Sequence, residues 1–447
     1  MNATPAAFVR WLAGLICRIF YRVDPVGAAP SAGALLLLPN HSNSLLDPAL
    51  VWATAGRDVR FLAKSTLFNG PFRSLLAAAG VIPVYRRIDK GVDVSKNTES
   101  FAAVAAALAA GDAVCLFPEG ISHSSGRLEP LRTGAARMAI AAETAGTRVT
   151  LVAVGLNFDR KTTFRSRVTV VYGPPFYADD LLEIEGEDDH AAVNALTDRI
   201  SDHIRGLLIE ADPEADQALV DRVDRIYAAA RGRSSDPAER VERRRVIAAG
   251  IDRLRADRPD HYDDILMQVR RYDERLRRFG LRDRHLDWNV STREAVDFAA
   301  REMLFAIVLV PLCVLGFLLC IVPYYLTWFV ARWIVARLIN RASDAIATAQ
   351  VFTGAVIYAA WFAFIAGVVW WEAGGLAALS VAIALPFLAS AALVAIERES
   401  AVLDAVRAWL LLRRPHSSTR DRLRRRRSEL ADILDEVHEW MEGARSV

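Results

Sequence analysis

The chain is poor in both lysine and cysteine. Only four of its 55 basic residues are lysines, and its 447 residues include only four cysteines. The cysteines stand in apolar stretches without a CxxC pair or a Cys/His pattern, so we expect neither a disulfide framework nor a metal site. Arginines interrupt the first apolar run and no A-x-A cleavage site follows it, so we expect no secretory signal.

An excess of charge of one sign is also lacking. The formal net charge is only +2, which indicates no nucleic-acid partner. Basic residues concentrate instead in 413–427, where eight arginines accompany one acid. Two interpretations stay open for this stretch: contact with anionic lipid headgroups, or a cytoplasmic retention signal.

Long apolar runs, in contrast, are abundant in the last third of the chain. Three runs carry no charged residue: Met303–Ala331 with 29 residues, Ala345–Trp371 with 27 and Ala373–Ile396 with 24. Each exceeds the roughly 20 apolar residues that cross a bilayer as a helix. The sequence therefore predicts an integral membrane protein with a large water-facing part.

The arginines near these runs constrain the topology. Short loops rich in Arg stay cytoplasmic, and both the loop after the first run and the tail after the third are basic. Three simple crossings would separate the tail from the N-terminal part. Pro311, Gly316 and Pro323 would allow the first run to fold back as a re-entrant segment, and the other two runs would then form a crossing hairpin turned at 372–375.

Residues 30–180 alternate short β-rich runs with alanine-rich helical ones. Apolar strands such as Ala34–Pro39 and Val149–Leu156 have no polar alternation, as strands covered on both faces require. The pattern predicts an α/β domain with a mostly parallel central sheet flanked by helices. The expected strands are 34–39, 59–63, 80–85, 113–117, 149–156 and 167–172, and the expected helices are 48–55, 72–79, 98–110 and 134–145.

Four further regions surround this domain. Residues 1–29 contain an amphipathic helix that suits either a membrane interface or a packed protein surface. Residues 181–302 form a charged helical arm, for which membrane docking, self-association, regulation and a solvated spacer all stay open. The membrane region is 303–396, and 397–447 is a basic cytoplasmic tail.

The first chemical motif is the sequence NHSNSLLDP, directly after the first predicted strand. His41 is suited to act as a general base near neutral pH, and Asp47 can accept its other ring N–H and fix the tautomer. In a continuous helix the six-residue separation is about 600° of turn, which would keep the two side chains apart. The segment must therefore bend if they are to meet.

Three more motifs follow predicted strands. The strand at 80–85 ends in Arg86 and Arg87, whose planar guanidinium groups match phosphate oxygens. Glu119 follows Pro118 at a tight turn, where a carboxylate can accept hydrogen bonds from a polyol. Arg132 precedes a helix N-terminus, a position that favours anions. Since ligands of open α/β sheets bind beyond the carboxyl ends of strands, we expect these groups to converge.

The order of NHSNSLLDP, GVIPVYRR, FPEGIS, PLRTGAARMA and VGLNF resembles the lysophospholipid and glycerol-3-phosphate acyltransferase superfamily. Within it, the chain looks most similar to the branch of fungal glycerol-3-phosphate and dihydroxyacetone-phosphate acyltransferases. The resemblance covers about 30–180 and implies the acyltransferase fold for that region. It also implies that His41, oriented by Asp47, deprotonates an acceptor hydroxyl that attacks an acyl thioester.

The resemblance implies an acceptor site as well. Its residues would be Arg86, Glu119, Gly120, Ser122, Lys64 and Arg132. Arg86 would hold the acceptor phosphate, and Glu119 with Gly120 the glycerol part. The chain departs from the family pattern in three places. Five residues rather than four separate His41 from Asp47, as in the fungal branch, and Arg132 stands where the family often has Lys. Ala153 stands in place of the proline of a late Val-Pro motif, which puts the shape of the substrate pocket in doubt.

The sequence thus predicts a membrane enzyme that acylates glycerol-3-phosphate in phospholipid synthesis. It would need no cofactor beyond acyl-CoA or acyl-carrier protein as co-substrate, and its partners would be that donor, a phosphorylated glycerol and membrane lipids. We expect the bacterial inner membrane, with the catalytic domain cytoplasmic. Alternatives are a 1-acylglycerol-3-phosphate acyltransferase and an inactive membrane scaffold. A serine hydrolase is disfavoured because no G-x-S-x-G elbow occurs, and a coupled transporter because the apolar runs carry no ionisable residue. Oligomeric state stays open.

Overall fold

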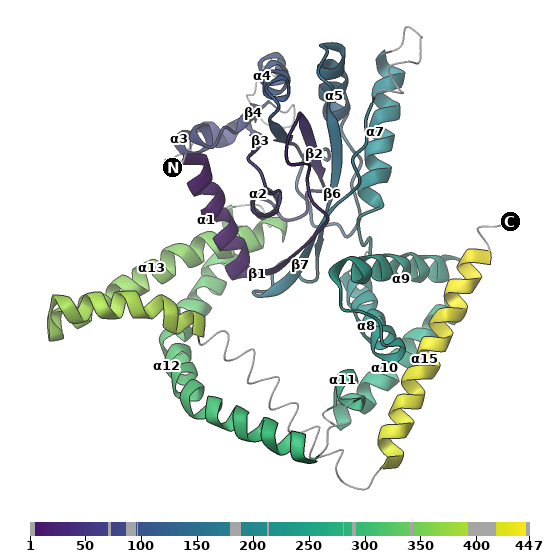
Figure 1. Ribbon diagram of the computed structural model, residues 1–447, viewed down its shortest axis with the longest axis vertical. Coiled ribbons are helices and arrows are strands. Elements are labelled where there is room, and N and C mark those ends of the chain that lie inside the picture. The colour runs from purple at the N-terminus through teal and green to yellow at the C-terminus, as the bar shows by residue number, and fades with distance from the viewer. Residues whose placement is uncertain are drawn as a thin grey trace. The chain divides into compact units, whose positions relative to one another are not determined.

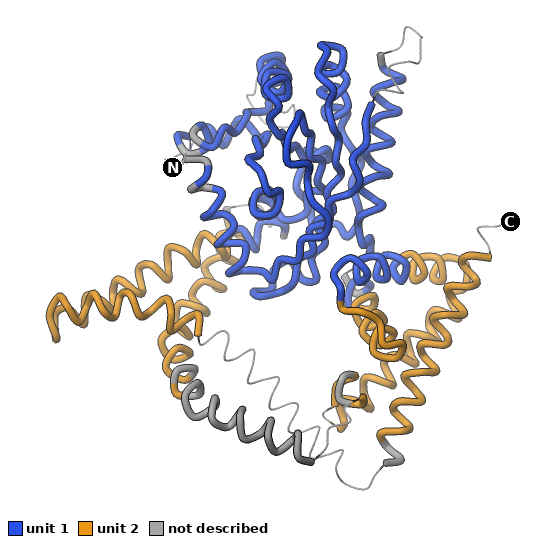
Figure 2. The backbone as a smooth tube through the Cα atoms, viewed as in Figure 1, with its two compact units in different colours: residues 1–218, 236–248, 341–348 blue, residues 219–235, 249–340, 349–447 orange. Residues whose placement is uncertain are grey.

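A computed structural model gives the structure of the chain. It describes residues 5–443 except 70–72, 86–94, 96, 179–188, 212–213, 280, 288–291, 339–342 and 392–416. The chain divides into two compact units, coloured separately in Figure 2. The first comprises residues 1–218, 236–248 and 341–348, and the second comprises 219–235, 249–340 and 349–447.

The first unit is built on a seven-stranded sheet of order β1-β7-β6-β2-β5-β3-β4 (Figure 1). The strands are β1 (Tyr21–Val26), β2 (Leu35–Pro39), β3 (Val59–Lys64), β4 (Ile82–Val84), β5 (Ala113–Cys115), β6 (Thr150–Phe158) and β7 (Ser166–Tyr172). Every neighbouring pair is parallel except β6 with β7. The mostly parallel sheet predicted from the continuous apolar strands is therefore confirmed.

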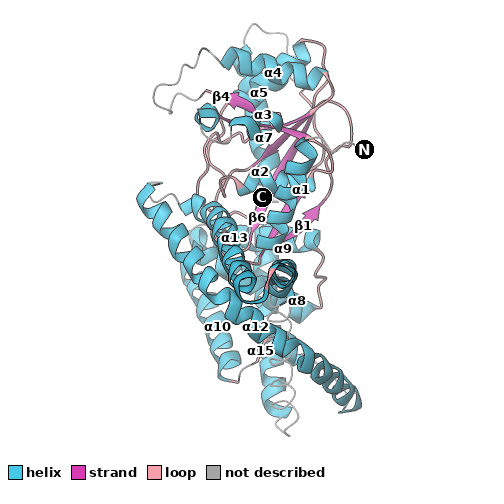
Figure 3. Cartoon of the chain, turned by 90° about the vertical axis from the view of Figure 1, so that its left-hand side faces the viewer, coloured by secondary structure: helices cyan, strands magenta, loops and turns pink. Residues whose placement is uncertain are grey.

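Helices cover both faces of the sheet (Figure 3). They are α1 (Pro5–Phe20), α2 (Leu46–Thr54), α3 (Arg73–Ala78), α4 (Asn97–Ala109), α5 (Gly134–Thr144) and α7 (Asp189–Arg205). Alternate residues of β2, such as Leu36 and Leu38, share one apolar core with α4, α5 and α7. On the opposite face, α2 meets β7, where the hydroxyls of Thr54 and Tyr172 lie 2.8 Å apart, and α1 packs on α2.

The N-terminal boundary predicted at residue 30 is wrong. The expected helix ends at Phe20, and Tyr21–Val26 continue as β1, which pairs in parallel with β7. The strand was missed because its partner lies about 145 residues later, so nothing local marks it. Its place at the sheet edge also explains how it tolerates Pro25, which has no N–H for a ladder.

The boundary predicted at residue 180 is wrong too. Helix α7 contributes Leu196, Ile200 and Ile204 to the core of the sheet domain. A side chain at position 155 would obstruct this packing, because a Cβ there would lie 2.7 Å from the carbonyl oxygen of Leu207. Gly155 thus lets the chain after α7 lie directly on β6.

Part of the predicted charged arm also belongs to the first unit. Residues 236–248 form the first half of α9 (Pro237–Asp257). Its Arg244 bonds Asp159 at 2.7 Å, and its Arg240 bonds Asp24 at 3.1 Å. For this part of the arm, the solvated-spacer interpretation is excluded because these arginines are buried against the domain.

The rest of the arm and the C-terminal tail form a helical bundle in the second unit. It includes most of α8 (Glu214–Arg231), with α10 (Pro259–Arg278), α11 (Asp283–Leu286) and α15 (Ser417–Gly443). Helix α10 buries Ile265, Val269, Tyr272 and Leu276 at helical spacing. The basic tail packs into this bundle, since Arg427 of α15 bonds both oxygens of Asp287, at 2.7 and 2.5 Å.

The first apolar run does not fold back on itself. It is part of one continuous helix, α12 (Thr292–Leu338), which runs through Pro311 and Pro323. A proline removes one helical hydrogen bond, which other groups can replace. Here the Leu319 carbonyl, which Pro323 cannot bond, accepts the indole N–H of Trp361 at 2.7 Å. The re-entrant alternative is therefore wrong.

Among the described residues, two helices are long and apolar enough to cross a membrane: Val314–Arg337 within α12, and α13 (Ile346–Ala373). Little of either is buried inside the protein, 17% and 0% of their most apolar windows. Helix α13 ends just before Gly374, whose φ of +84° is a conformation that glycine adopts readily. A shorter apolar helix follows over Gly375–Ala391. This interruption coincides with the turn predicted at 372–375, and the membrane-crossing hairpin stays a prediction.

Candidate active site

His41 and Asp47 meet at the carboxyl end of β2. The ring Nδ1 of His41 lies 2.9 Å from Asp47 Oδ2. The intervening chain bends through Ser44, which has a φ of +50°, and through a turn in which Leu46 N–H donates to the Asn43 carbonyl at 3.1 Å. Asp47 then falls in the first turn of α2. The bend predicted from the six-residue separation is what brings the two side chains together.

The carboxylate of Asp47 is held rigidly. The residue is completely buried, and its Oδ2 also accepts the backbone N–H groups of Ser42 at 2.8 Å and Asn43 at 2.7 Å. A buried carboxylate facing Nδ1 favours the tautomer with the proton on that nitrogen, which leaves Nε2 as the basic atom. The ring also stacks on Phe117, with centroids 4.1 Å apart, so its orientation is fixed from two sides.

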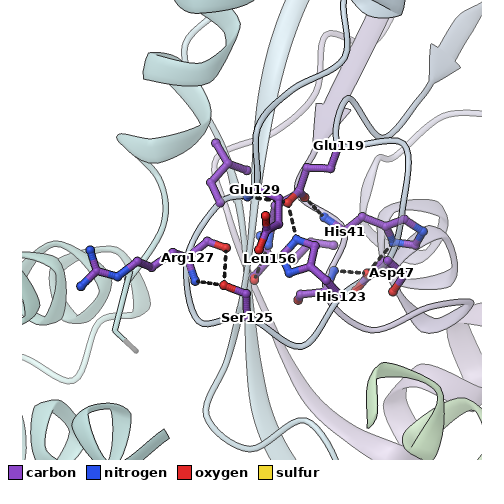
Figure 4. Close-up of polar contacts among 12 residues, drawn as sticks. His41, Asp47, Glu119, His123, Ser125, Arg127, Glu129 and Leu156 are labelled. Atoms are coloured by element: carbon purple, nitrogen blue, oxygen red, sulfur yellow. Dashed lines mark hydrogen bonds and ion pairs between the residues drawn. The ribbon is translucent and has the colours of Figure 1, made fainter. Parts of the chain in front are cut away.

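Glu119 forms the centre of a second cluster (Figure 4). Its Oε1 accepts the backbone N–H of His41 at 2.5 Å, and its Oε2 contacts the ring Nε2 of His123 and accepts the Glu129 N–H at 2.9 Å. The side chain is fully buried. These bonds position the backbone of His41, and the direct binding of a polyol by Glu119 stays a prediction.

The other predicted residues of the FPEGIS motif lie in the same cluster of loops. Ser122 Oγ accepts the Ser44 N–H at 2.9 Å, which ties this loop to the one that carries His41. Gly120 adopts a φ of +72°, and a Cβ there would lie 3.2 Å from Cγ of Arg132. Arg132 in turn donates its backbone N–H to Pro118 at 2.7 Å while its side chain stays exposed.

The predicted phosphate-binding residues are only partly described. Lys64 is exposed at the end of β3, in register with Val84 of β4. Arg86, two residues beyond Val84, lies outside the described residues. Because β2, β3, β4 and β5 are parallel neighbours, their carboxyl ends share one edge of the sheet. Lys64 is the last residue of β3, and His41 and Glu119 follow β2 and β5.

Two supporting residues were missed. The phenol oxygen of Tyr21 on β1 accepts the Asn43 side-chain amide at 2.8 Å and donates to the Lys161 carbonyl. Burial raises the pKa of Tyr21, so the phenol stays protonated. Asn43 was visible in the motif, but nothing in the sequence marked Tyr21, because β1 itself was not predicted.

Two further side chains near the His41–Asp47 pair, Asn40 and Cys17, are given no chemical role in the site. Asn40 clamps β6, accepting the Leu156 N–H at 2.7 Å. Burial, with the negative charge of Asp47, raises the pKa of the Cys17 thiol to about 12, so this thiol is not a nucleophile near neutral pH. Within the described parts of the chain, no group of three or more His, Cys, Asp and Glu is placed to hold a metal ion.

Part of the chain is similar to known acyltransferases. Residues 22–157 match the sequence profile of the family described as Acyltransferase. The chain is 26% identical to glycerol-3-phosphate O-acyltransferase 2 of Saccharomyces cerevisiae over 49% of this chain and 30% of that protein. It is 32% identical to a lyso-ornithine lipid O-acyltransferase of Brucella abortus, over 28% of this chain and 46% of that protein.

A solved structure, the 1-acyl-sn-glycerophosphate acyltransferase PlsC of Thermotoga maritima, matches 45% of this chain and 80% of that chain. Its sequence identity to this chain is 15%, and the TM-score is 0.33. The matched regions span less than half the length of both curated relatives. Residues 22–157 thus carry an acyltransferase sequence, and the α/β domain is similar to glycerol-3-phosphate and lysolipid acyltransferases.

Proposed function

We propose that this chain is a membrane-bound O-acyltransferase that transfers a fatty acyl group from a thioester to a hydroxyl of glycerol-3-phosphate. The observation that carries the proposal is the His41–Asp47 pair, 2.9 Å apart at the carboxyl end of β2 in a domain of acyltransferase sequence. The yeast relative is named for the same acceptor. The apolar helices α12 and α13 suit an enzyme whose product is a lipid.

In the proposed reaction, Nε2 of His41 takes the proton of the acceptor hydroxyl as its oxygen attacks the thioester carbonyl. The new C–O bond forms, the tetrahedral intermediate collapses and the C–S bond breaks. The thiol of CoA or of the acyl carrier leaves with a proton returned by the imidazolium. Asp47 stabilises that imidazolium through Nδ1, and no cofactor takes part.

The acceptor would bind through its phosphate. Lys64 and Arg132 are exposed cations on segments next to the dyad loops, and the resemblance adds Arg86. Glu119, Gly120 and Ser122 shape the loop that faces the glycerol part. We place the enzyme in the bacterial inner membrane, with its α/β domain in the cytoplasm where acyl-CoA and acyl-carrier protein are made.

A second candidate is acylation of a lysolipid, which would make phosphatidate from 1-acylglycerol-3-phosphate or a related product. The Brucella relative, named for a lysolipid acceptor, favours this alternative. The purified full chain, reconstituted in vesicles, would be given labelled acyl-CoA with each acceptor in turn. Preferred acylation of glycerol-3-phosphate supports the first proposal, preferred acylation of a lysolipid selects the second, and transfer to none overturns both.

We expect Arg86→Ala to raise the KM for glycerol-3-phosphate more than it lowers kcat, because the lost interaction with phosphate is made equally in the ground and transition states. Steady-state kinetics with varied acceptor would measure both constants. Arg73→Ala, an exposed arginine at the start of α3, serves as the charge-matched control. An unchanged KM, or equal use of an acceptor without phosphate, would remove Arg86 from this role.

A further inference from the structure

Four consecutive backbone N–H groups hold the loop of the proposed base, and all four donate to side chains. They belong to residues 41–44, which lie just beyond β2. The middle two bond Asp47, whereas the first and the last bond Glu119 and Ser122 of the loop that follows β5. Because the outer acceptors belong to another loop, the place of His41 depends on how that second loop is held.

His123, in the same second loop, is bonded to His41 both directly and through Glu119 (Figure 4). Its backbone N–H donates to the His41 carbonyl at 3.2 Å. Its ring Nε2 contacts Oε2 of Glu119, the carboxylate whose Oε1 accepts the His41 N–H. An ionised carboxylate accepts hydrogen bonds and donates none, so the ring nitrogen carries the proton. The N–H and the carbonyl of His41 are therefore both held by the Glu119–His123 pair.

The ring of His123 is nearly enclosed by the protein. Only 14% of the side chain is exposed, and its Nδ1 is buried without a hydrogen-bond partner among the residues that the structure describes. A buried polar atom that is left unpaired costs free energy, so packing alone would favour an apolar side chain here. The contact of Nε2 with Glu119 is what accounts for a histidine at this position.

Both carboxylate oxygens of Glu119 bond groups of the protein. Oε1 accepts the His41 N–H at 2.5 Å, and Oε2 accepts the Glu129 N–H at 2.9 Å beside its contact with the ring of His123. The Glu119 side chain is fully buried. Of these three partners, two are backbone groups and only His123 contributes a side chain. Removing that ring would release one side of the carboxylate and weaken its hold on His41.

We propose that His123 is a positioning residue, which holds the Glu119 carboxylate on the backbone of His41 and thereby fixes the place of the His41 ring. Asp47 sets the orientation of that ring through Nδ1, and His123 sets the position of the backbone that carries it. His123 itself touches neither the acyl donor nor the acceptor. The effect on catalysis rests on the proposed function, because it requires His41 to be the base; the fixing of the loop does not.

A pair of amide substitutions tests this role in the full chain. The amide nitrogen of Gln lies close to where Nε2 of His does, so His123→Gln can still donate to Glu119. The amide nitrogen of Asn is one bond nearer the backbone, so His123→Asn cannot.

The matched control is His203→Asn. His203 is also partly buried in the first unit, where it stacks on Phe176 with ring centroids 4.0 Å apart. Phe176 pairs with Leu151 near the amino end of β6, at the edge of the sheet opposite the proposed site.

Steady-state kinetics in vesicles, with the acceptor that the chain uses best, give the first readout. We expect His123→Asn to lower kcat roughly 10- to 100-fold, as a displaced catalytic group does, with little change in the acceptor KM. His123→Gln should recover most of the lost kcat, and His203→Asn should match the wild type. A raised KM at unchanged kcat would show that His123 binds substrate, and equally slow Asn and Gln variants would show that it acts otherwise than through Glu119. Either result overturns the proposal.

Hydrogen exchange gives a second readout that requires no turnover. Mass spectrometry of a peptide spanning residues 40–45 follows the four N–H groups of the loop. We expect this peptide to exchange faster in His123→Asn than in the wild type, His123→Gln or His203→Asn, because the His41 N–H is then less firmly bonded. Equal exchange in all four proteins would overturn the proposal.

The two readouts separate this proposal from the proposed function. A chain that acylates no acceptor would sink the proposed function, yet its loop would still exchange faster in His123→Asn. Conversely, unchanged exchange together with unimpaired acyl transfer by His123→Asn would overturn the positioning role alone.

Discussion

We expect Tyr21 to influence catalysis through its hydrogen bond to Asn43. Its phenol fixes the amide of Asn43, and the backbone N–H of Asn43 bonds the oxygen of Asp47 that faces His41. Removing that phenol would leave the dyad in place but its loop less constrained. Small displacements of a catalytic group cost more in rate than in stability, so Tyr21 should behave as a positioning residue.

We therefore expect Tyr21→Phe to lower kcat roughly tenfold, because the loop of His41 loses a constraint, with little change in the acceptor KM. Tyr172→Phe is the matched control, since Tyr172 is also buried and its hydroxyl lies 2.8 Å from that of Thr54, at the opposite end of α2 from Asp47. Both variants should lose about 1–3 kcal/mol of stability. Equal kcat values for the two would show that Tyr21 is merely structural.

At the scale of single residues, the sequence predicts a site contact only where the chemically suitable residues are close neighbours in the chain. His41 and Asp47 could be paired because a bend between close neighbours was the single requirement. The burial of Glu119 could not be predicted from the sequence. It accompanies contacts of its carboxylate with the ring of His123 and with the backbone N–H of Glu129, which form only in the folded loop. Tyr21 was out of reach for the same reason: its partners Asn43 and Lys161 become neighbours only in the folded sheet.

Secondary-structure elements inside the α/β domain follow the predicted ones to within a few residues, from β2 to β7. Continuous apolar strands and alanine-rich helices are strong local signals. The errors fall at the two ends, β1 and α7, where charged composition concealed elements that pack far along the chain. Helix α7 was assigned to the charged arm although its apolar residues recur at helical spacing.

Because α7 completes the core, Leu196→Ala should destabilise the first unit by about 2–5 kcal/mol, the usual cost of emptying a buried leucine site. Asn194→Ala, two residues earlier and exposed, should change stability by less than about 0.5 kcal/mol. Thermal unfolding of both variants in detergent would compare them. A small effect for Leu196→Ala would show that α7 does not belong to the core.

Over the whole molecule, the helical bundle of the second unit restricts the membrane topology. Helices α10 and α11 precede the apolar helices and α15 follows them, yet Arg427 of α15 bonds Asp287 and Arg420 bonds the Leu286 carbonyl at 2.9 Å. If the apolar helices cross a membrane, these contacts place both flanks on one side of it. We therefore expect an even number of crossings, although the continuous α12 removes the re-entrant segment that arginine placement had suggested.

We accordingly expect tags at both chain ends to lie on the cytoplasmic side, so that they are accessible in inverted vesicles and protected in right-side-out vesicles. One of the three apolar helices would then lie along the membrane surface. The helix over Gly375–Ala391, the shortest of the three described, is the one expected not to cross. A C-terminal tag accessible only from outside would contradict the bundle contacts.

His41 is the proposed base for acyl transfer, and the proposed function depends on it more than on any other residue. The decisive measurement is single-turnover transfer from labelled acyl-CoA by wild-type protein and by His41→Ala in vesicles, with unfolding followed in parallel. We predict unchanged unfolding and a rate lowered by at least roughly 10² to 10⁴-fold, the contribution of a general base. Near-wild-type transfer by a folded His41→Ala variant would contradict the account.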